Sequence, residues 1–499
     1  MLAKVFAPAL VGVEGRLVEV ECDISNGLPA FIVVGLADKA VDEAKERVRG
    51  ALKNSQLVLP PKRVTLNLAP ADLPKDGTGY DLAMSVALLL SSGQIEGPIS
   101  DALFVGELAL DGSLRPVHGA LCYSKLALNN KIKRLFLPLQ NAIEASMLPG
   151  IEIFPVEHIH QLYRHLIGEE SIPAFKSAPI IASDVNNTTD LSSVYGQSQA
   201  KRALEIAAAG GHNLLLSGPP GAGKTLLAKA LPGILPPLTL DEVIEVTQVH
   251  SLAGVNQSGI VTSRPFRNPH HTSSDIALIG GGRWPKPGEI SLSHHGVLFL
   301  DELPEFPRSV LEVLRQPLED GQVTVARATG SVTFPAKFML VATQNPCPCV
   351  YAGDPLRDCS CSPAGIARYH RRVSGPLLDR IDLAINVERV KQDDLIKAKA
   401  GESTAAVLAR VKSARQLQAK RYASGVKTNA DMDNNDIKRH CALDADATSL
   451  ANTALMQLSL SARAYMRVLK VARSIADLAG STNVQTPHLA EALQYRARA

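Results

Sequence analysis

The stretch NLLLSGPPGAGKTLLAKAL, residues 213–231, decides the fold of the central part of this chain. An apolar run of strand type ends at Ser217, a glycine-rich loop follows, and an apolar-periodic helix begins after Thr225. The loop has the spacing G-x-x-x-x-G-K-T, and its place between a strand and a helix predicts a P-loop. Such a spacing arises by chance in only roughly one or two of a hundred chains of this length.

The loop is predicted to hold the phosphates of ATP. Gly221 and Gly223 let the backbone turn so that successive N–H groups face phosphate oxygens at a helix N-terminus. Lys224 is expected to reach the β- and γ-phosphates, and the Thr225 hydroxyl is expected to bind Mg²⁺. The predicted ATP-binding residues are Gly218, Pro219, Pro220, Gly221, Ala222, Gly223, Lys224 and Thr225.

Two further apolar runs, 297–300 and 338–343, are expected to be parallel strands that end at the same site. The first delivers Asp301 and Glu302, and the second is followed by Asn345. Carboxyl ends of parallel strands meet at one edge of a sheet. Asp301 is therefore predicted to bind Mg²⁺, Glu302 to act as the base that polarises the attacking water, and Asn345 to hold that water.

Two arginines are candidates for stabilising the charge of the transferred phosphate. Arg380 lies in GPLLDRID (375–382) and Arg463 lies in LSARAYMR (460–467). An arginine that reaches the γ-phosphate from a neighbouring subunit raises the rate of hydrolysis by orders of magnitude. An ordinary surface arginine is the alternative for each position.

The length, net charge and cysteine content of the chain limit which class of protein it can be and which compartment it is expected to occupy. With 499 residues the chain is too long for one core, and a formal net charge of +3 demands no polyanionic partner. Any nucleic-acid contact must therefore rest on a local concentration of charge. There is no signal-peptide layout, the near-apolar stretch 82–90 is too short for a membrane span, and the seven cysteines do not suggest a disulfide scaffold. A cytoplasmic protein without membrane contact is the expectation.

Three regions and a linker are expected along the chain. Residues 1–167 mix short β-like runs with helices, residues 168–190 form a polar linker, residues 191–390 alternate strands and helices, and residues 391–499 are helical. In the first region, strands are expected at 31–34, 64–68, 102–108, 134–137 and 151–154, and helices at 40–54, 81–92 and 120–129. In the last region, helices are expected at 395–400, 404–424, 434–441, 445–458, 461–478 and 487–496.

Four cysteines lie within fifteen residues, at Cys347, Cys349, Cys359 and Cys361, on the loop 347–361. Four thiolates can close a tetrahedral, structural Zn²⁺ site, although the C-x-C spacing is tighter than the usual C-x₂-C. Free thiols or a redox-sensitive loop are the alternatives.

Two histidine pairs, 270–271 and 294–295, are predicted to be polar core or DNA-facing loop residues. Adjacent side chains on a strand or a helix point to different faces. Each pair is therefore expected to be a poor two-ligand metal site.

The order of these motifs resembles the AAA+ superfamily and, within it, the magnesium-chelatase-like clade that also holds the minichromosome maintenance helicases. Inside that clade the chain is similar to the YifB family of competence proteins. The similarity covers nearly the whole chain and implies an α/β AAA+ P-loop ATPase core with an α-helical lid. It is carried by GHNLLLSGPPGAGKT (211–225), RPFRNPHHTSS (264–274), PKPGEISLSHHGVLFLDELPEF (285–306), NPCPC (345–349), SGPLLDRIDL (374–383) and the stretches 27–55 and 67–89.

The resemblance assigns roles to three of the residues outside the P-loop. Asn345 looks like sensor 1, Arg380 like the arginine finger of a neighbouring subunit, and Arg463 like sensor 2. A finger supplied by a neighbour implies a ring, which in such families is a homo-hexamer.

The segment 322–334 looks like the pre-sensor hairpin that lines the pore of related helicases. It makes Arg327, near the hairpin tip, the first candidate for a DNA contact and Lys337, at its base, the second. A solvated basic side chain on an exposed turn is the alternative for either residue.

Residues 60–125 resemble the Lon protease fold, through PKDG (74–77) and GELALDGSLRPVHGAL (106–121). Peptidases of that fold use a Ser–Lys pair. The two positions fall here at Gly79 and Leu121, so the resemblance implies an α+β Lon-like domain that is catalytically dead. Nearby alternatives for such a pair are Ser85, Ser124 and Lys125.

The function implied by the resemblance is that of an ATP-driven hexameric DNA helicase or translocase. It would promote branch migration during homologous recombination in natural transformation, on single-stranded or branched DNA, with recombination proteins as further partners. Two alternatives stay open: a chelatase-type motor subunit, and an ATP-dependent protein-remodelling or protease-associated factor. Stimulation of ATP hydrolysis by DNA, by a chelatase partner with porphyrin or by an unfolded protein distinguishes the three.

Overall fold

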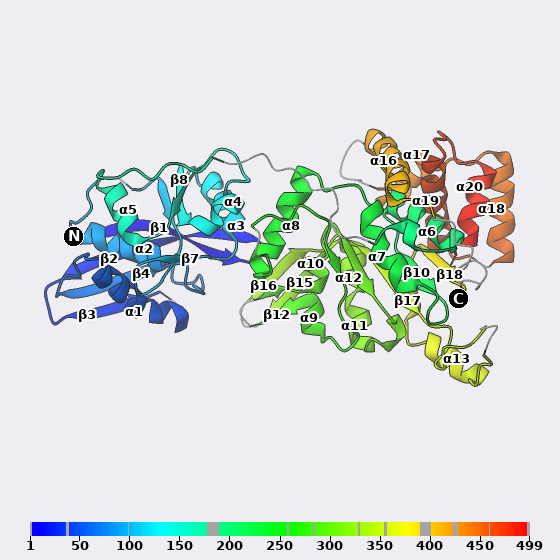
Figure 1. The fold of residues 1–499 in the computed structure, drawn as a ribbon, viewed down its shortest axis with the longest axis horizontal. Coiled ribbons are helices and arrows are strands. Elements are labelled where there is room, and N and C mark those ends of the chain that lie inside the picture. Colours follow the sequence, from blue (N-terminus) through cyan, green and yellow to red (C-terminus); the bar gives the residue numbers. More distant parts are fainter. Residues whose placement is uncertain are drawn as a thin grey trace.

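The computed structural model contains two large β-sheets that follow one another along the chain, each packed against helices (Figure 1). A seven-stranded sheet forms the N-terminal part, and a five-stranded sheet follows, with the C-terminal helices at its far end (Figure 1). The structure describes residues 2–35, 39–97, 99–176, 189–256, 259–282, 285–327, 330–353, 357–389, 401–422, 428–458 and 460–496.

The N-terminal sheet is mixed and has the strand order β3-β4-β2-β1-β5-β8-β9. Strand β2 pairs antiparallel with both β1 and β4, whereas the remaining pairings are parallel. The strands are β1 (Ala3–Val11), β2 (Glu14–Ser25), β3 (Ala30–Val34), β4 (Arg63–Ala69), β5 (Ala102–Phe104), β8 (Arg134–Pro138) and β9 (Glu152–Val156), with a short ladder of β6 (Glu107–Leu108) and β7 (Leu114–Arg115). The helices are α1 (Lys39–Asn54), α2 (Asp81–Ser91), α3 (Ala120–Asn129), η1 (Leu139–Asn141), α4 (Ala142–Ala145) and α5 (Ile159–Leu166).

The three helices and most of the strands expected in this part are confirmed, with two corrections. The two longest strands, β1 and β2, were not predicted, although β2 buries Val18, Val20 and Cys22 in strict alternation. The single strand expected at 102–108 is wrong, because the chain leaves β5 after Phe104 and resumes as β6 two residues later.

The serines proposed as alternatives for a Ser–Lys pair are engaged with the backbone. Ser85 Oγ donates to the Asp81 carbonyl at 2.9 Å, and Ser124 Oγ donates to the Ala145 carbonyl at 2.8 Å. Both serines are fully buried, whereas Lys125 is exposed. These residues therefore form no Ser–Lys pair, and the Lon-like assignment of this part stays a prediction.

The five-stranded sheet has the order β11-β14-β17-β10-β18, and all of its pairings are parallel. The predicted apolar runs are β14 and β17, which are neighbours, and every residue of β14 is buried. β10 lies between β17 and β18, so the P-loop leaves the sheet from an interior strand. The strands are β10 (Leu214–Ser217), β11 (Phe266–Arg267), β14 (Val297–Leu300), β17 (Met339–Gln344) and β18 (Leu383–Asn386).

Strands β15 (Gln322–Arg327) and β16 (Gly330–Pro335) pair antiparallel, which confirms β-structure on both sides of the expected turn, while the pore role stays a prediction. Their register runs from the pair Gln322–Pro335 to the pair Arg327–Gly330. A second small ladder pairs β12 (Gly280–Gly281) with β13 (Lys286–Pro287). The helices of this part are η2 (Leu191–Ser193), α6 (Ser198–Gly210), α7 (Lys224–Ile234), α8 (Leu240–Ala253), α9 (Asp275–Ile279), α10 (Glu289–Leu292), η3 (Leu303–Glu305), α11 (Arg308–Val313), α12 (Arg315–Asp320), α13 (Pro363–His370) and α14 (Gly375–Leu378).

The C-terminal helices pack onto the five-stranded sheet's own core. Val411 and Val471 are buried in the same apolar cluster as Leu214 of β10. The expected helices are confirmed apart from 395–400, which lies outside the described residues. They are α16 (Thr404–Arg421), η4 (Asn429–Asp431), α17 (Asn434–His440), α18 (Ala445–Gln457), α19 (Ala462–Leu478) and α20 (Thr486–Gln494).

Helix α8 joins the N-terminal part to the five-stranded part. Gln248 Nε2 donates to the Val13 carbonyl at 2.7 Å, and the Gly119 N–H donates to Ser251 Oγ at 2.8 Å. The turn between β1 and β2 also approaches the hairpin so closely that a Cβ on Gly12 would collide with Val332. The N-terminal part therefore touches both α8 and the β15–β16 hairpin.

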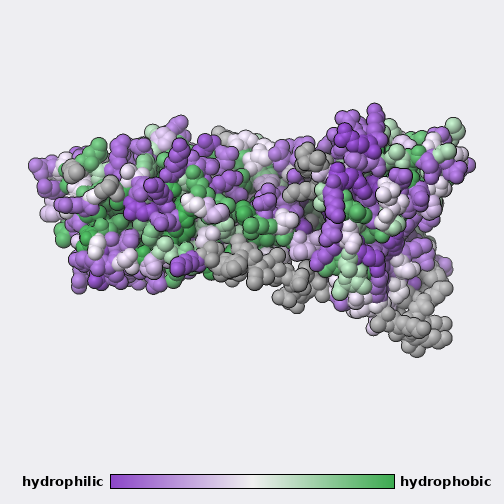
Figure 2. All heavy atoms as spheres, turned by 90° about the horizontal axis from the view of Figure 1, so that it is seen from above, coloured by the Kyte–Doolittle hydropathy of each residue, from purple (hydrophilic) through white to green (hydrophobic). Residues whose placement is uncertain are grey.

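Hydrophilic side chains are spread over the face seen in Figure 2, and apolar side chains reach it in separate patches. Among the described residues, no helix has the length and apolar character needed to cross a membrane.

Candidate functional site

The P-loop opens into a pocket of about 420 Å³ at the carboxyl edge of the five-stranded sheet. Lys224 Nζ donates to Asn345 Oδ1 at 3.0 Å, and Thr225 Oγ1 donates to Asp301 Oδ2 at 3.2 Å. Glu302 lines the same pocket. The structure thus brings together the residues that the sequence predicted from three separate strand ends.

The backbone of the loop has the shape that the glycines were expected to allow. Gly223, the N-cap of α7, has a φ of 91°, which strains any residue with a side chain. A Cβ on Gly218 would collide with the Val387 carbonyl next to β18. The chain therefore needs glycine at both ends of this turn.

Lys224 is a buried cation whose ammonium group is held by carbonyl oxygens. It donates to the Gly218 carbonyl and, at 3.1 Å, to the Pro219 carbonyl. Burial lowers the pKa of Lys224, and the charges of Asp301 and Glu302 oppose that shift. Phosphate oxygens placed in the loop would compensate the Lys224 charge far better than neutral carbonyls do.

Thr343 orients both acidic residues and was missed by the sequence reasoning. Its hydroxyl donates to Asp301 Oδ1 and accepts the Glu302 N–H at 2.9 Å. The side chain is fully buried, and Glu302 has a φ of 57°, a conformation that needs such support. The available signal was a hydroxyl inside the apolar run 338–343, next to the strand that ends in Asp301.

Gln197 is a second residue that the sequence did not single out. Its Nε2 donates to the Ala222 carbonyl at 3.2 Å and to the Glu388 carbonyl. The side chain thus ties the P-loop to the segment after β18. No local pattern distinguishes this glutamine from others, because both of its acceptors are distant in sequence.

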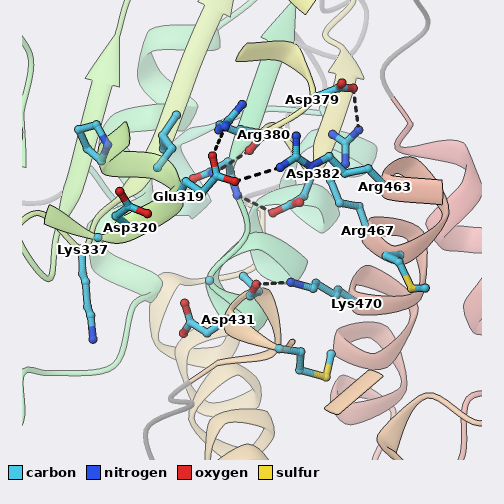
Figure 3. A pocket seen from close by; sticks show the side chains of 18 of the residues that line it. Glu319, Asp320, Lys337, Asp379, Arg380, Asp382, Asp431, Arg463, Arg467 and Lys470 are labelled. Carbon is cyan, nitrogen blue, oxygen red and sulfur yellow. Dashed lines mark hydrogen bonds and ion pairs between the residues drawn. The ribbon is translucent and has the colours of Figure 1, made fainter. Parts of the chain in front are cut away.

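Arg380 and Arg463 lie together, but they do not line the P-loop pocket. Both form ion pairs with Glu319, and the Arg463 pair measures 3.1 Å (Figure 3). The two guanidinium groups lower the pKa of Glu319, chiefly through the hydrogen bond from Arg380. The three residues line a cavity of about 680 Å³.

The position of Arg380 in the sheet explains why it is remote from the P-loop. It lies three residues before β18, and its carbonyl accepts from Asn213 Nδ2 at 2.8 Å, just before β10 begins. The P-loop follows the other end of β10. Arg380 and the P-loop of one chain therefore lie at opposite edges of the parallel sheet.

Lys337 and Arg327 are placed as expected for a hairpin base and tip. Lys337 is exposed, lines the cavity that also holds Arg380, and extends away from the arginines (Figure 3). Arg327 forms the last backbone pair of the hairpin, with Gly330, and its side chain lies outside the described part. Neither position by itself tests a DNA contact.

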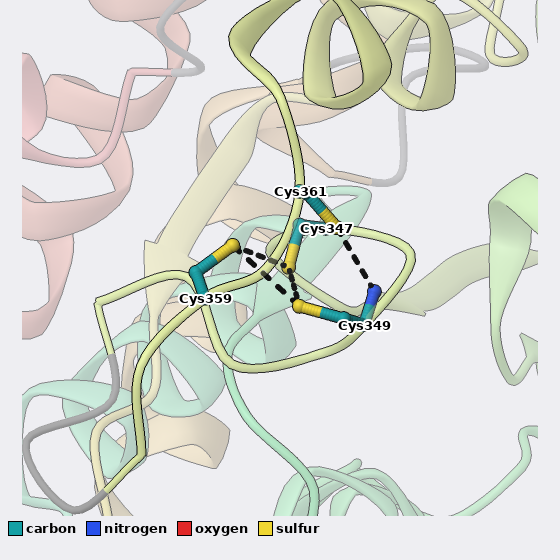
Figure 4. A group of neighbouring side chains, drawn as sticks. All are labelled: Cys347, Cys349, Cys359 and Cys361. Carbon is teal, nitrogen blue, oxygen red and sulfur yellow. Dashed lines mark hydrogen bonds between the residues drawn. The ribbon is translucent and has the colours of Figure 1, made fainter.

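The four cysteines converge on one point beside the nucleotide pocket (Figure 4). Their sulfur atoms all lie within 4.8 Å of one another, and Cys347 Sγ is 3.4 Å from Cys349 Sγ and 3.7 Å from Cys359 Sγ. A tetrahedral zinc with bonds of about 2.3 Å places its sulfurs about 3.8 Å apart. A hydrogen bond from the Tyr351 backbone lowers the pKa of Cys349 to about 5, whereas the pKa of Cys359 is raised to about 12 and that of Cys361 is also raised. The sulfur positions, rather than these pKa shifts, therefore carry the argument for a metal.

The expectation that neighbouring histidines point to different faces is wrong for both pairs. The rings of His294 and His295 lie 4.0 Å apart, and those of His270 and His271 lie 4.1 Å apart. His295 has a φ of 54°, outside strand and helix, so both rings of its pair reach one oxygen of Glu245, at 3.0 and 2.7 Å.

Glu245, His294 and His295 bring three possible metal ligands within 4.8 Å of one another, but the hydrogen bonds of His294 oppose a metal on its Nε2. His294 Nδ1 accepts the Lys337 N–H at 3.0 Å, so the ring proton of neutral His294 sits on Nε2 and is donated to Glu245. A metal on Nε2 would need that position deprotonated.

Comparison with known proteins covers almost the whole chain. Residues 190–395 match the family model described as magnesium chelatase, subunit ChlI, residues 20–141 match subunit ChlI of Mg-chelatase, and residues 401–496 match its C-terminal model. Competence protein ComM of Haemophilus influenzae is 46% identical over 99% of this chain and 97% of its own. YifB of Escherichia coli is 43% identical over 99% of this chain and 97% of its own. A magnesium-chelatase 67 kDa subunit of Chlorobaculum tepidum is 30% identical over 31% of this chain and 23% of its own.

Replacing Thr343 by valine tests whether its hydroxyl positions the two acidic residues. We expect ATP hydrolysis to fall about 10- to 100-fold, because a small displacement of a water-activating group costs that much in rate. Nucleotide affinity should change little, since Lys224 and the loop backbone are intact. Steady-state turnover and binding of a fluorescent ATP analogue measure the two effects. Thr453→Val, at an exposed position of α18, is the matched control, and full turnover of Thr343→Val would contradict the assignment.

Proposed function

Because this chain belongs to the magnesium-chelatase-like family that includes competence protein ComM and YifB, we propose that it is a ring-forming, Mg²⁺-dependent ATPase that moves DNA. The observation that carries the ATPase proposal is the convergence of Lys224, Thr225, Asp301, Glu302 and Asn345 on one pocket. Each supplies a chemical group that phosphoryl transfer needs, and they come from three separate strand ends.

In the proposed reaction, the P-loop backbone and Lys224 hold the β- and γ-phosphates. Thr225 and Asp301, which already contact each other, would hold Mg²⁺, which neutralises phosphate charge when bound. Glu302 accepts the proton of the attacking water, and the Asn345 amide orients that water. The Thr343 hydroxyl holds Glu302 and Asp301 in position during the step through its two hydrogen bonds.

Among the described residues that line the P-loop pocket, Lys224 is the one cation. Arg380 and Arg463 are paired with Glu319 at the other edge of the sheet. We propose that they act on the nucleotide of a neighbouring subunit, exchanging the carboxylate of Glu319 for phosphate oxygens. A head-to-tail contact of this kind closes into a ring when the rotation permits, and a homo-hexamer is the proposed assembly.

DNA is the proposed substrate, and the support for it is the competence protein that is 46% identical over nearly the whole chain. The proposed activity is branch migration on single-stranded or branched DNA during the recombination that follows DNA uptake. The β15–β16 hairpin, with Arg327 and Lys337, is the proposed pore element. A chelatase-type motor subunit is the second candidate, since the matching family models carry that description.

The cysteine cluster is proposed to hold one structural zinc ion. The sulfur separations fit a tetrahedral site, and none of the sulfur atoms lies at disulfide bonding distance from another. The cluster follows Asn345 directly along the chain. A zinc ion there would fix the loop that follows Asn345, the residue proposed to orient the attacking water.

We expect the purified protein to contain about one zinc per chain, released when the cysteines are modified. Cys349→Ser should lose the metal, because it removes a ligand from the centre of the cluster. Cys441→Ser, at a buried cysteine remote from the cluster, should keep it. Metal analysis by mass spectrometry of both variants decides the point, and an equal metal content would refute the zinc site.

The proposed function is tested by the rate of ATP hydrolysis with and without single-stranded and branched DNA. We expect DNA to stimulate the wild type several-fold and Glu302→Gln to abolish turnover while retaining ATP, because the base is lost and the phosphate contacts are kept. If Glu302-dependent turnover ignores DNA at low salt, the DNA motor is excluded. Stimulation by a chelatase partner with porphyrin, or by an unfolded protein, would then identify the substrate class.

A further inference from the structure

A cationic cavity lies next to the nucleotide pocket and has no part in the chemistry above. It measures about 460 Å³. Arg308 begins α11, whereas Arg368 lies in the last turn of α13 and Arg371 and Arg372 follow it. Its lining residues are Pro304, Glu305, Phe306, Arg308, Arg368, Arg371 and Arg372. Helix α11 and the end of α13, about sixty residues apart in sequence, thus place four arginines around one cavity.

Three of the four positive charges are uncompensated. Glu305 is the one acidic residue of the lining, and it pairs with Arg372 at 2.9 Å. Within the part of the chain that the structure describes, the guanidinium groups of Arg308, Arg368 and Arg371 have neither an ion pair nor a hydrogen bond, and all three residues are exposed. Like charges around one cavity repel each other, and a bound polyanion would remove that repulsion.

Helix termini explain only part of this arrangement. Cations at the C-terminus of a helix are favoured by its dipole, which accounts for Arg368 in the last turn of α13 and for Arg371 at its C-cap. Arg308 stands at the first position of α11, where the same effect disfavours a cation. Its convergence with the α13 arginines therefore calls for a ligand rather than for helix stabilisation.

The cavity is connected to both sides of the nucleotide site. His370 Nε2 lies 3.1 Å from the carbonyl oxygen of Pro346, the residue after Asn345. Arg372 donates to the Pro304 carbonyl at 3.4 Å, in the short helix that follows Glu302. Any ligand that moves α13 would thus move the segments that carry the proposed water-holding and water-activating groups.

The start of α13 is also fixed. Ser362 follows Cys361 of the cysteine cluster, and its hydroxyl accepts the Gly365 N–H at 3.1 Å as the helix cap. The start of α13 is therefore capped beside the cysteine cluster, so a ligand would act at the opposite, arginine-bearing end of the helix.

We propose that Arg308, Arg368, Arg371 and Arg372 bind the phosphodiester backbone of a DNA strand and that this contact stimulates ATP hydrolysis through Asn345 and Glu302. The inference rests on the proposed DNA-dependent function and adds a site that lies outside the pore hairpin. Guanidinium forks match phosphate oxygens in pairs, and successive phosphates suit several arginines better than one anion does. Since the whole chain carries a net charge of only +3, such a local concentration of charge is what a DNA contact requires.

The test is the salt dependence of DNA binding by the double variant Arg308→Gln/Arg371→Gln, in the full chain with a non-hydrolysable ATP analogue. The matched control is Lys438→Gln/Arg439→Gln, which removes two exposed charges from α17. Fluorescence anisotropy of a labelled single-stranded oligonucleotide over a series of KCl concentrations gives the affinity and the slope of log affinity against log salt. We expect the arginine variant to bind more weakly, with a slope shallower by about 1.4, or about 0.7 for each lost phosphate contact.

A second readout is turnover. The arginine variant should lose DNA stimulation and keep the basal rate, whereas the control should keep both. An unchanged slope and unchanged stimulation in the arginine variant overturn the inference, while a wild type that responds to DNA leaves the proposed function intact. A wild type that ignores DNA overturns both. Loss of ring assembly with unaltered DNA affinity, seen by mass photometry, would instead make the cavity a contact between copies of the chain.

Discussion

The parallel register of β10, β14 and β17 is the constraint on which the rest of the structure depends. Leu215 of β10 pairs with Ala342 of β17, and Leu300 of β14 pairs with the same residue from the other side. This register sets the P-loop, Asp301 and Asn345 at one edge of the sheet. A shift of one residue in β14 would separate Asp301 from Thr225, a shift in β17 would separate Asn345 from Lys224, and a shift in β10 would break both contacts.

Because the strands are parallel, the residues that precede them lie together at the opposite edge of the sheet. Arg380 before β18 lies there, and Arg463 of the C-terminal helices joins it on Glu319. Under the proposed function, these arginines complete the site of a neighbouring chain, because within one chain they line a different cavity from the P-loop. In that proposal, assembly brings the two groups of residues together, and the nucleotide state would then be a property of the contact between subunits.

Sequence reasoning recovered the parts of the site that local patterns encode. The P-loop, the apolar strand before Asp301 and the hairpin at 322–334 each occupy a continuous stretch with its own periodicity, and the structure has them where they were expected. The cysteine cluster could also be predicted from the sequence, because its four cysteines lie close together along the chain. The ends of the C-terminal helices were also found within a few residues.

Other features depend on contacts that no local pattern carries. Thr343 matters because its strand lies beside the one that ends in Asp301, and Gln197 matters because its acceptors are distant in sequence. The histidine pair was misjudged because the positive φ of His295 breaks the alternation that the argument assumed. The arginine cavity was not foreseen, since Arg308 and Arg371 are neighbours only after the cysteine loop has folded.

The most direct measurement of the central claim, that each site is completed by a neighbour, is turnover of mixed variants. Arg380→Ala and Glu302→Gln are each expected to be inactive alone. When they are mixed in equal amounts, about one contact in four pairs an intact Glu302 with an intact Arg380, so about a quarter of wild-type turnover should return. Glu302→Gln mixed with Lys224→Ala, where both defects lie on the same surface, should stay inactive. If the first mixture stays as inactive as the second, Arg380 does not act across the subunit contact and the account is wrong.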